Sequence, residues 1–262
     1  MWASSDNIGD DIQTLSAINF LEKKGINEYS YIDREYLSKY DGPPVVLLMN
    51  GWFTTNIKNF LPSSKITPLI TSFHCDYRAH SIIENNIDFF KRYEPIGCRD
   101  TYTVEIFKKH QVDCYFSGCL TLYFDECNQN TGEKYLVDID GPCHYIPHFN
   151  QDLSNYEDYT AIDQHLPEEK FRFDLKFRLK KAKELLNLYR AAEHVVTTRI
   201  HCTMPCRAFN TKCSFAHKHY DLDVRFKGLE PILNGKKELH KNTSFDKGLL
   251  KNIRSNFDSI NL

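Results

Sequence analysis

The chain has 262 residues, 41% hydrophobic and 26% charged, which is enough to bury one large core or two smaller ones. Its 33 basic and 35 acidic side chains nearly cancel, giving a net charge of −2. This balance excludes a strong field for nucleic acid or anionic lipid, so local positive charge must hold any anionic ligand. No apolar run approaches the roughly 20 residues of a membrane span, and residues 1–12 are too polar for a secretory signal. We therefore expect a cytoplasmic protein with no membrane span and no nucleic-acid partner.

The nine cysteines include no C-x-x-C pair, which argues against a disulfide framework. One cluster offers ligands of the kind that bind zinc, namely His201, Cys202, Cys206 and Cys213. Its spacing matches none of the usual paired zinc patterns. We predict no bound metal.

The first half of the chain alternates short apolar runs with helical patterns, which indicates an α/β fold with a doubly wound sheet. The expected strands cover residues 29–32, 45–49, 66–73, 95–98 and 114–116. The expected helices cover residues 12–21, with possible caps at Asp6 and Asn7, 80–92, and 101–110 behind a capping Asp100.

A polar, turn-rich stretch at 125–132 precedes a new strand at 135–139. We place a domain boundary there, which gives an N-terminal domain of residues 1–128 and a C-terminal domain of residues 129–262.

In the C-terminal domain, residues 171–189 have helical spacing, although the alternation at 171–177 alone also suits a strand. A buried strand is expected over 194–200, and Pro205 suits the first turn of a following helix. A further strand is expected at 214–216.

Polar residues follow several of these strands at the point where ligands bind in open α/β sheets. They are Asn50, Trp52, His74, Arg99, Ser117, Gly118, Arg199 and His201. If the last strand extends through Arg199 and His201, both side chains leave one face beside a helix N-terminus. Each residue alone also has a structural interpretation, such as an ion pair for either arginine, packing for His201, or a place in the core for Trp52.

The segment Asn7-Ile8-Gly9-Asp10-Asp11 has two carboxylates beside one glycine, which disfavours a phosphate loop. Two interpretations stay open. Acidic residues are favourable in a first helical turn, and Asn7 and Asp10 are also suited to binding substrate hydroxyls.

Taken together, these residues resemble the polysaccharide pyruvyl transferase family, in particular its shorter members, over roughly residues 7–125 and 180–229. The pieces that carry the resemblance are N-I-G-D-D-I-Q-T-L at 7–15, Y-I-D-R-E at 31–35, N-G-W at 50–52, P-I-G-C-R-D at 95–100, S-G-C-L-T-L at 117–122, V-V-T-T-R-I-H at 195–201 and D-V-R-F-K-G at 223–228. Only six residues precede Asn7, which leaves little room for the strand that usually opens the family's first domain.

The resemblance implies a GT-B-like fold, with two Rossmann-like domains facing a cleft, and phosphoenolpyruvate as the donor substrate. It maps donor-site positions onto Arg99, Arg199 and His201, and adds Arg225 as a substrate-binding candidate. A glycan or sugar is the implied acceptor, and no metal or other cofactor is required. The oligomeric state, the acceptor sugar and the ketal positions stay open.

The expected chemistry fits these residue types. Arginine holds a carboxylate or phosphate by bidentate hydrogen bonds, which suits Arg99 and Arg199. Protonation of the enol methylene needs a general acid, for which His201 is the candidate. Two alternatives remain, a GT-B-type glycosyltransferase that uses a nucleotide sugar and a non-catalytic carbohydrate-binding protein of the same fold.

Overall fold

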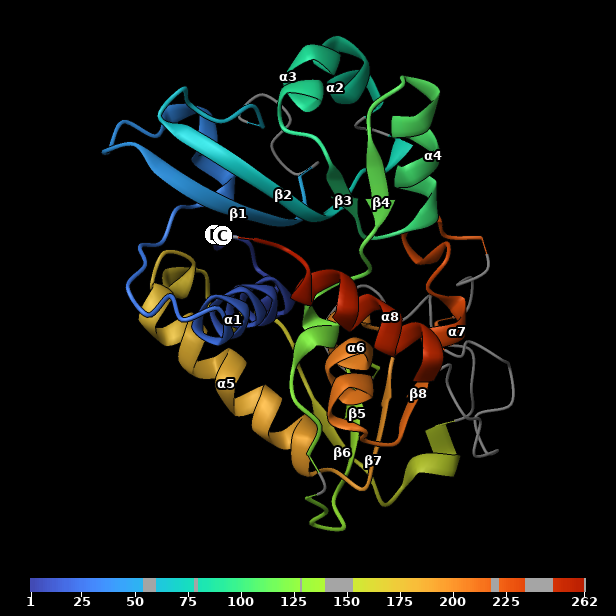
Figure 1. The fold of residues 1–262 in the computed structure, drawn as a ribbon. Coiled ribbons are helices and arrows are strands. Elements are labelled where there is room, and N and C mark those ends of the chain that lie inside the picture. The colour runs from blue at the N-terminus through green and yellow to red at the C-terminus, as the bar shows by residue number, and fades with distance from the viewer. Residues whose placement is uncertain are drawn as a thin grey trace.

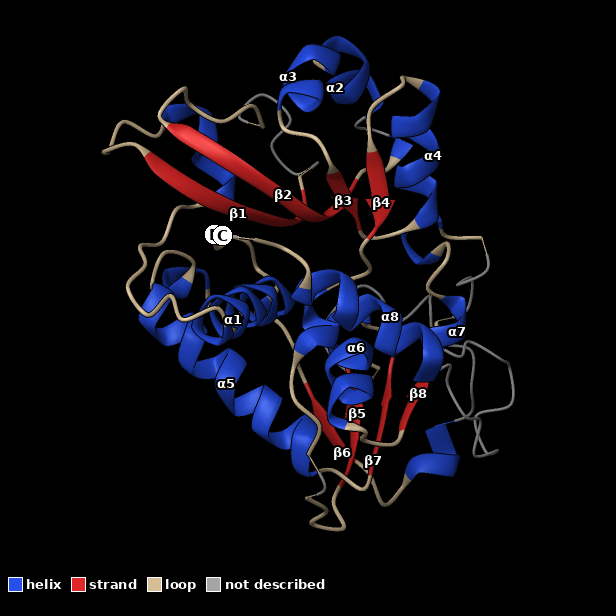
Figure 2. Ribbon diagram, viewed as in Figure 1, coloured by secondary structure: helices blue, strands red, loops and turns tan. Residues whose placement is uncertain are grey.

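The computed structural model describes residues 1–53, 60–77, 80–127, 129–139, 153–217, 222–233 and 247–261. Over these ranges the chain is an α/β protein with two parallel sheets of four strands each, and helices pack around both (Figures 1 and 2). The predicted α/β class is confirmed, and the two sheets are consistent with Rossmann-like units.

The first sheet has the strand order β1-β2-β3-β4 and all its pairs are parallel. Its strands are β1 Val45–Trp52, β2 Ile66–His74, β3 Ile96–Cys98 and β4 Cys114–Phe116. All four were predicted, with β1 continuing three residues beyond the expected end. The strand predicted at 29–32 is wrong, because these residues form no strand and only the next residue, Asp33, makes an isolated bridge, with Trp2.

The second sheet has the strand order β6-β5-β7-β8 and is also parallel throughout. Its strands are β5 Lys134–Val137, β6 Thr160–Ile162, β7 His194–Thr197 and β8 Cys213–Phe215. The short, exposed β6 was not predicted, because three residues carry too little pattern to stand out.

The α-helices are α1 Ile8–Lys23, α2 His80–Asn85, α3 Ile87–Arg92, α4 Thr101–Lys109, α5 Leu175–Ala191, α6 Ile200–Phe209, α7 Glu230–Leu233 and α8 Lys247–Asp258. Shorter 3₁₀ turns lie at Arg34–Lys39, Leu120–Tyr123, Leu153–Tyr156, Glu169–Phe171 and Val224–Phe226. The helix predicted at 80–92 is interrupted at Asn86, whose side-chain amide donates to the Ile82 carbonyl at 2.7 Å. Residues 171–189 are helical only from Leu175 onward, behind the capping Asp174.

Helix α1 is buried on several of its faces, because it lies between the two sheets (Figure 1). It contacts α5, α6 and the 3₁₀ turn at Leu120–Tyr123, and it also contacts β1 of the first sheet. Arg178 of α5 forms a fully buried ion pair with Asp11 of α1. The N-terminal helix thus packs against elements of the second half of the chain, while the domain boundary at 128/129 stays a prediction.

Pro205 is the sixth residue of α6 and not part of its first turn, so the predicted position is wrong. Proline has no backbone N–H, so the usual hydrogen bond from this position to the carbonyl of His201 cannot form. The helix tolerates this because it is buried and packed over most of its length.

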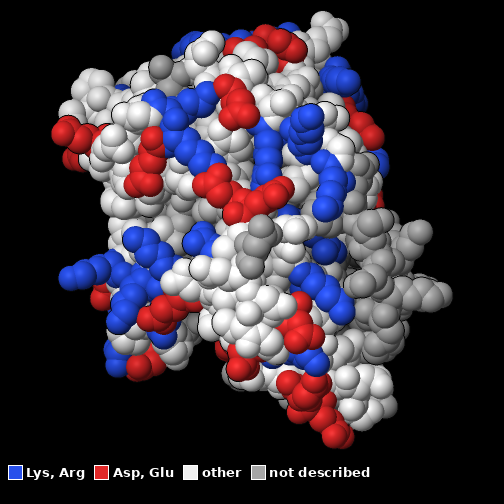
Figure 3. Space-filling view, turned by 60° about the horizontal axis from the view of Figure 1, so that its bottom comes forward, with Lys and Arg blue, Asp and Glu red and all other residues white. Residues whose placement is uncertain are grey.

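The charged side chains of the surface are mixed in sign. Figure 3 shows Lys and Arg interspersed with Asp and Glu over the face drawn, in keeping with the near-neutral net charge. Within the described ranges, none of the helices combines the length and apolar character that crossing a bilayer requires.

Candidate functional site

The N-terminus of α6 carries Arg199 and His201. β7 ends at Thr197, whose hydroxyl accepts the Arg199 backbone N–H at 3.0 Å and donates to the Val137 carbonyl at 3.0 Å. Arg199 is the N-cap residue and His201 lies in the first turn. The prediction that a strand runs through both residues is therefore wrong, and what they share is a helix N-terminus, where backbone N–H groups favour an anion.

The Arg199 guanidinium is oriented by side chains that follow β5 and β6. Its Nε donates to Asp138 Oδ2 at 2.5 Å, and its Nη2 lies 2.9 Å from His165 Nε2. Asp138 adopts a left-handed backbone with φ 53°, and its other oxygen accepts the Gln164 N–H at 2.7 Å. Asp138 therefore joins the ends of three neighbouring strands.

Asp138, Asp163 and His165 place their ligand atoms within 4.8 Å of one another, a geometry that can hold a metal ion. Hydrogen bonds to Asp138 and Asp163 raise the pKa of His165 to about 9, against the opposing charge of Arg199. The Arg199 guanidinium already supplies positive charge to Asp138, so Asp138 acts here as an anchor for an arginine, while Asp163 pairs with His165. Sequence spacing did not reveal this group.

Arg99 follows β3 and immediately precedes the capping Asp100 of α4. Its side chain is 97% buried by its neighbours, with only 3% exposed, yet its Nε has no hydrogen-bond partner among the described residues. The nearest carboxylate oxygen, Asp100 Oδ2, lies 3.9 Å from Nε. Burial lowers the pKa of Arg99, with Asp100 opposing this shift. Arg99 is thus a buried cation with unused donor capacity.

His201 is influenced by charged residues from both halves of the chain. Burial, followed by the positive charge of Arg99, lowers the pKa of His201 to about 3. Arg34 and Arg199 add to this lowering, whereas the carboxylate of Asp10 opposes it. The His201 Nε2 is buried without a partner among the described residues. His201 is therefore a neutral imidazole within reach of three arginine charges.

His74, at the end of β2, forms a buried pair with Asp100, with Nδ1 and Oδ2 2.5 Å apart. Burial and the charge of Arg99 lower the pKa of His74, while Asp100 opposes this. The other oxygen of Asp100 accepts both the N–H and the hydroxyl of Thr103, so the carboxylate is fixed. The His74 Nε2 has no described partner, and Arg99 lies beside it.

The N-terminus of α1 carries two further predicted residues, Asn7 and Asp10. Asn7 is the N-cap and accepts the Gly9 N–H at 2.9 Å. Asp10 receives two hydrogen bonds from Arg34, at 3.2 and 3.3 Å, and one from Ser5 at 2.7 Å. Burial alone would raise the pKa of Asp10, but Arg34, Ser5 and His201 outweigh it and lower the pKa. Asp10 is therefore ionised and held in place.

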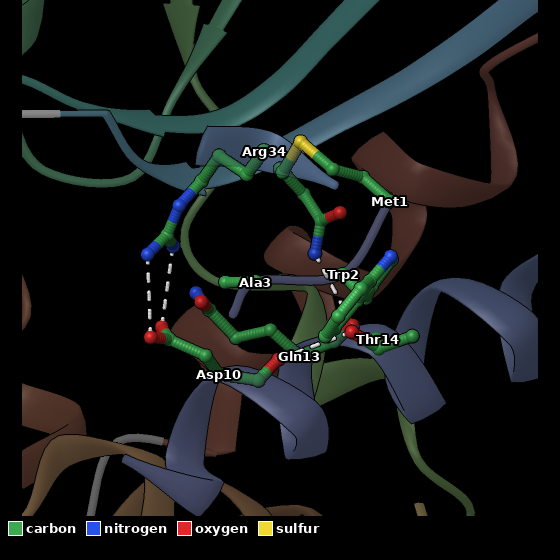
Figure 4. Close-up of a pocket in the computed structure, with 8 residues that line it drawn as sticks. Met1, Trp2, Ala3, Asp10, Gln13, Thr14 and Arg34 are labelled. Atoms are coloured by element: carbon green, nitrogen blue, oxygen red, sulfur yellow. Dashed lines mark hydrogen bonds and ion pairs between the residues drawn. The ribbon is translucent and has the colours of Figure 1, made fainter. Parts of the chain in front are cut away.

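A small pocket lies beside this ion pair (Figure 4). It is lined by Met1, Trp2, Ala3, Asp10, Gln13, Thr14, Arg34 and Asn50. Asn50 lies within β1 at the irregularity of pairing between Met49 and Gly51, and it donates its amide to the Gln13 carbonyl of α1 at 3.3 Å. The pocket thus brings the predicted residues Asp10 and Asn50 together.

Three other predicted residues, Ser117, Gly118 and Trp52, have contacts within the fold. The Ser117 hydroxyl is used by the Cys98 and Gly118 carbonyls and by the Ser72 N–H. Gly118 has φ +66°, and a Cβ there would lie 2.7 Å from the Ile253 side chain of α8. Trp52 is half-buried and pairs in register with His74. Their role in substrate binding stays a prediction.

Arg225 is partly exposed and bound by Asp223, with its Nε 2.9 Å from both carboxylate oxygens. The charges of both residues act on the pKa of Arg99, Arg225 lowering it and Asp223 raising it. The segment is held there because the Lys227 carbonyl accepts the Thr101 N–H at 2.9 Å.

The charges of Arg99, Arg199, Asp10 and the unpredicted Arg34 thus all act on the pKa of His201. Arg34 lies in the Y-I-D-R-E piece at 31–35, but its sequence neighbours gave no hint of a partner on α1. Asp138 and His165 were also missed, since only their strand-end positions mark them.

Comparison with known proteins gives one match. The family model described as polysaccharide pyruvyl transferase matches residues 7–215, more than three quarters of the chain. No curated protein and no solved structure matches significantly.

Proposed function

We propose a function from the premise that the chain belongs to the polysaccharide pyruvyl transferase family. The protein transfers the pyruvyl group of phosphoenolpyruvate onto two hydroxyls of a sugar in a glycan, forms a cyclic ketal and releases phosphate. One observation supports this most directly: the charges of Arg99 from the first half of the chain and Arg199 from the second both lower the pKa of the buried His201 imidazole. The two Rossmann-like halves, residues 1–128 and 129–262, then form a GT-B-like pair.

Phosphoenolpyruvate carries a carboxylate and a phosphate, and a near-neutral protein must bind both with local cations. Arg99 is suited to this because its buried Nε has no competing partner. Arg199 is fixed by Asp138 through Nε and lies against His165 through Nη2, and its positive charge adds to that of Arg99 in attracting the donor. The N-terminus of α6 adds backbone N–H groups for the same anion.

The proton that starts the reaction is assigned to His201, whose lowered pKa of about 3 makes the imidazole neutral near pH 7. Three arginine charges keep it so, together with burial. A bound donor with about three negative charges offsets the arginines and raises the pKa of the imidazole. Donor binding then brings a proton onto His201, so the acid is formed only when its substrate is present.

In the proposed reaction the imidazolium gives its proton to the methylene carbon, and the neighbouring carbon becomes electrophilic. A sugar hydroxyl forms a C–O bond to that carbon, and its proton returns to His201. The bond to the phosphate oxygen then breaks, a second hydroxyl attacks, and its proton leaves with hydrogen phosphate. Atoms balance without a metal or redox cofactor.

The test incubates the protein with phosphoenolpyruvate and a panel of hexosides, measuring phosphate release and product mass together. We expect one glycoside to gain a pyruvyl ketal. If a nucleotide sugar instead raises the melting temperature and yields a glycosylated product, the protein is a glycosyltransferase. Binding of sugars without turnover of either donor would identify a carbohydrate-binding protein.

The matched variant is His201→Asn, which keeps a polar side chain and removes the titratable ring. As a general acid, His201 contributes about 10²-fold or more to kcat, so the variant should fold and bind donor but turn over at least that much more slowly. Turnover within about threefold of wild type would remove His201 from the chemistry, and His74 would become the next residue to test.

A further inference from the structure

Gly9 is the second residue of α1, where it is buried and has a helical backbone. This backbone conformation is open to alanine as well, since glycine is favoured only where φ is positive. Glycine also weakens a helix relative to alanine, because it loses more conformational freedom on folding. The helix itself therefore gives no reason for a glycine at this position, and the surroundings of α1 must supply one.

The surroundings leave no space for a side chain at Gly9. A Cβ atom at this position would lie 2.6 Å from Gln164 Nε2, 2.9 Å from Asn7 Oδ1 and 3.2 Å from the Cβ of His201. Carbon atoms in favourable contact are about 3.5–4.0 Å apart, so all three distances are too short. The first turn of α1 thus packs directly against the first turn of α6, which carries His201.

Two of the side chains around Gly9 are held by hydrogen bonds. Asn7 Oδ1 caps the helix, because it accepts the Gly9 N–H at 2.9 Å. Gln164 is 1% exposed, and its Oε1 accepts the Tyr189 hydroxyl at 3.3 Å. Neither side chain can turn away from Gly9 without losing its hydrogen bond.

The backbone of Gln164 is fixed on both sides as well. Its N–H donates to Asp138 Oδ1 at 2.7 Å, and its carbonyl accepts the Ile8 N–H of α1 at 2.9 Å. His201 has no such restraint at Nε2, which lacks a partner among the described residues. A methyl group at position 9 is therefore expected to displace His201 first.

We propose that Gly9 is a positioning residue for His201, because the absence of a side chain lets the first turn of α1 hold the histidine in place. Misplacing a reacting group by about 1 Å can slow a reaction by as much as 10²-fold. The effect of Gly9 on turnover rests on the proposed function, whereas its effect on the place of the His201 imidazole does not.

The test is Gly9→Ala, with Gly248→Ala as the matched control. Gly248 is the second residue of α8, as Gly9 is of α1, but it is exposed. Gly248→Ala should raise the melting temperature by about 1–4 °C and leave kcat unchanged. In Gly9→Ala this gain should be absent, and kcat should fall about tenfold or more with the KM for phosphoenolpyruvate within about threefold.

The place of the imidazole is followed by NMR of protein with labelled histidine. The His201 signals are identified by their absence from the spectrum of His201→Asn. They should shift in Gly9→Ala and coincide with those of wild type in Gly248→Ala.

A rescue separates displacement of His201 from a general loss of stability. The double variant Gly9→Ala/Gln164→Ser removes the atom closest to the new methyl group, so its His201 signals and its kcat should return towards those of wild type. If Gly9→Ala does not fold, the double variant should fold. A double variant as impaired as the single one would overturn the proposal.

Unshifted His201 signals in Gly9→Ala, or a kcat within about threefold of wild type, would also overturn it. If wild type transfers no pyruvyl group, only the proposed function fails. Shifted His201 signals in Gly9→Ala, restored in the double variant, would then still support the positioning role.

Discussion

Two buried polar regions flank α1, and they differ in how completely their hydrogen bonds are made. On the α5 side, Arg178 donates to both carboxylate oxygens of Asp11, at 3.0 and 2.7 Å, and to the Ser5 carbonyl at 2.5 Å. On the side facing the first sheet, Arg99 Nε and His201 Nε2 have no described partner. Both regions bury cations, but only the first satisfies them.

This difference separates a structural role from a binding role. A satisfied buried ion pair fixes one element against another, and removing half of it leaves an uncompensated charge. Unsatisfied buried groups reduce stability, and such groups persist where a ligand completes them. The comparison predicts opposite consequences for equivalent substitutions on the two sides of α1.

The largest effect is expected for Arg178→Met. This change leaves Asp11 buried without its partner, which should lower the free energy of unfolding by about 3–5 kcal/mol. Chemical denaturation would measure it. The double variant Asp11→Leu/Arg178→Met removes both charges and should recover part of the loss. If Arg178→Met is as stable as wild type, the α1–α5 pair does not hold the two elements together.

The next effect is expected for Arg99→Lys, which keeps the charge but replaces a planar fork by a point charge. We expect kcat/KM for phosphoenolpyruvate to fall at least tenfold, equivalent to about 1.4 kcal/mol of transition-state stabilisation. Steady-state kinetics provides the measurement. A fall of less than about threefold would mean that Arg99 is not a bidentate donor ligand.

Arg99→Met is the control that completes the comparison with Arg178→Met. Because Arg99 has no described hydrogen bond through Nε, removing its charge should leave the melting temperature unchanged or higher. A large loss of stability would place Arg99 with Arg178 as a structural cation.

A smaller effect is expected for Asp138→Asn. The left-handed backbone of Asp138 is acceptable to asparagine, so the change acts on the contacts of the side chain with Arg199 and the Gln164 N–H. The asparagine amide carries no negative charge and has only one acceptor oxygen for the Arg199 guanidinium and the Gln164 N–H. Arg199 therefore loses its orientation. We expect about a tenfold rise in the KM for phosphoenolpyruvate with little change in kcat. An unchanged KM would show that Arg199 needs no anchor.

The last prediction is a pH dependence of stability that comes from His201. Burial and the neighbouring arginines lower its pKa from 6.5 to about 3 in the folded protein. Between these values the unfolded chain binds a proton that the folded protein does not, so stability falls as pH falls through this window. The slope contributed by this one group is at most about 1.4 kcal/mol per pH unit.

The check compares denaturation of wild type and His201→Asn at several pH values between 4 and 7, where the difference in slope isolates the imidazole from the other groups. Parallel curves for the two proteins would mean that His201 is accessible to protons in the folded state.

Local patterns in the sequence were sufficient for much of the fold. Apolar runs of β-type predicted β1 to β4, and the Asp100 cap marked the start of α4, because these features depend on residues close together in the chain. The junction rule for parallel strands also singled out Asn50, His74, Arg99 and the pair at 199 and 201, since carboxyl ends of strands gather at one edge.

Other features depended on contacts between distant residues. β7 ends at Thr197, whose hydroxyl donates to the Val137 carbonyl of β5. Arg199 and His201 therefore lie at the N-terminus of α6 and not on a strand, as predicted. Arg34 meets Asp10, and Arg199 meets Asp138, although nothing in their local sequence marks these pairings.

The sequence by itself determined the α/β class, most strand positions, the family resemblance and the residue types available for anion binding. Only the tertiary structure decided which polar atoms are satisfied, because Asp11 and Arg178 are 167 positions apart and meet solely through the packing of α1 on α5. The same packing brings Gln13 against Asn50 while leaving one atom of each unused. Hydrogen-bond satisfaction is a property of the three-dimensional surroundings of a group, which is why it distinguishes the structural side of α1 from the candidate binding side.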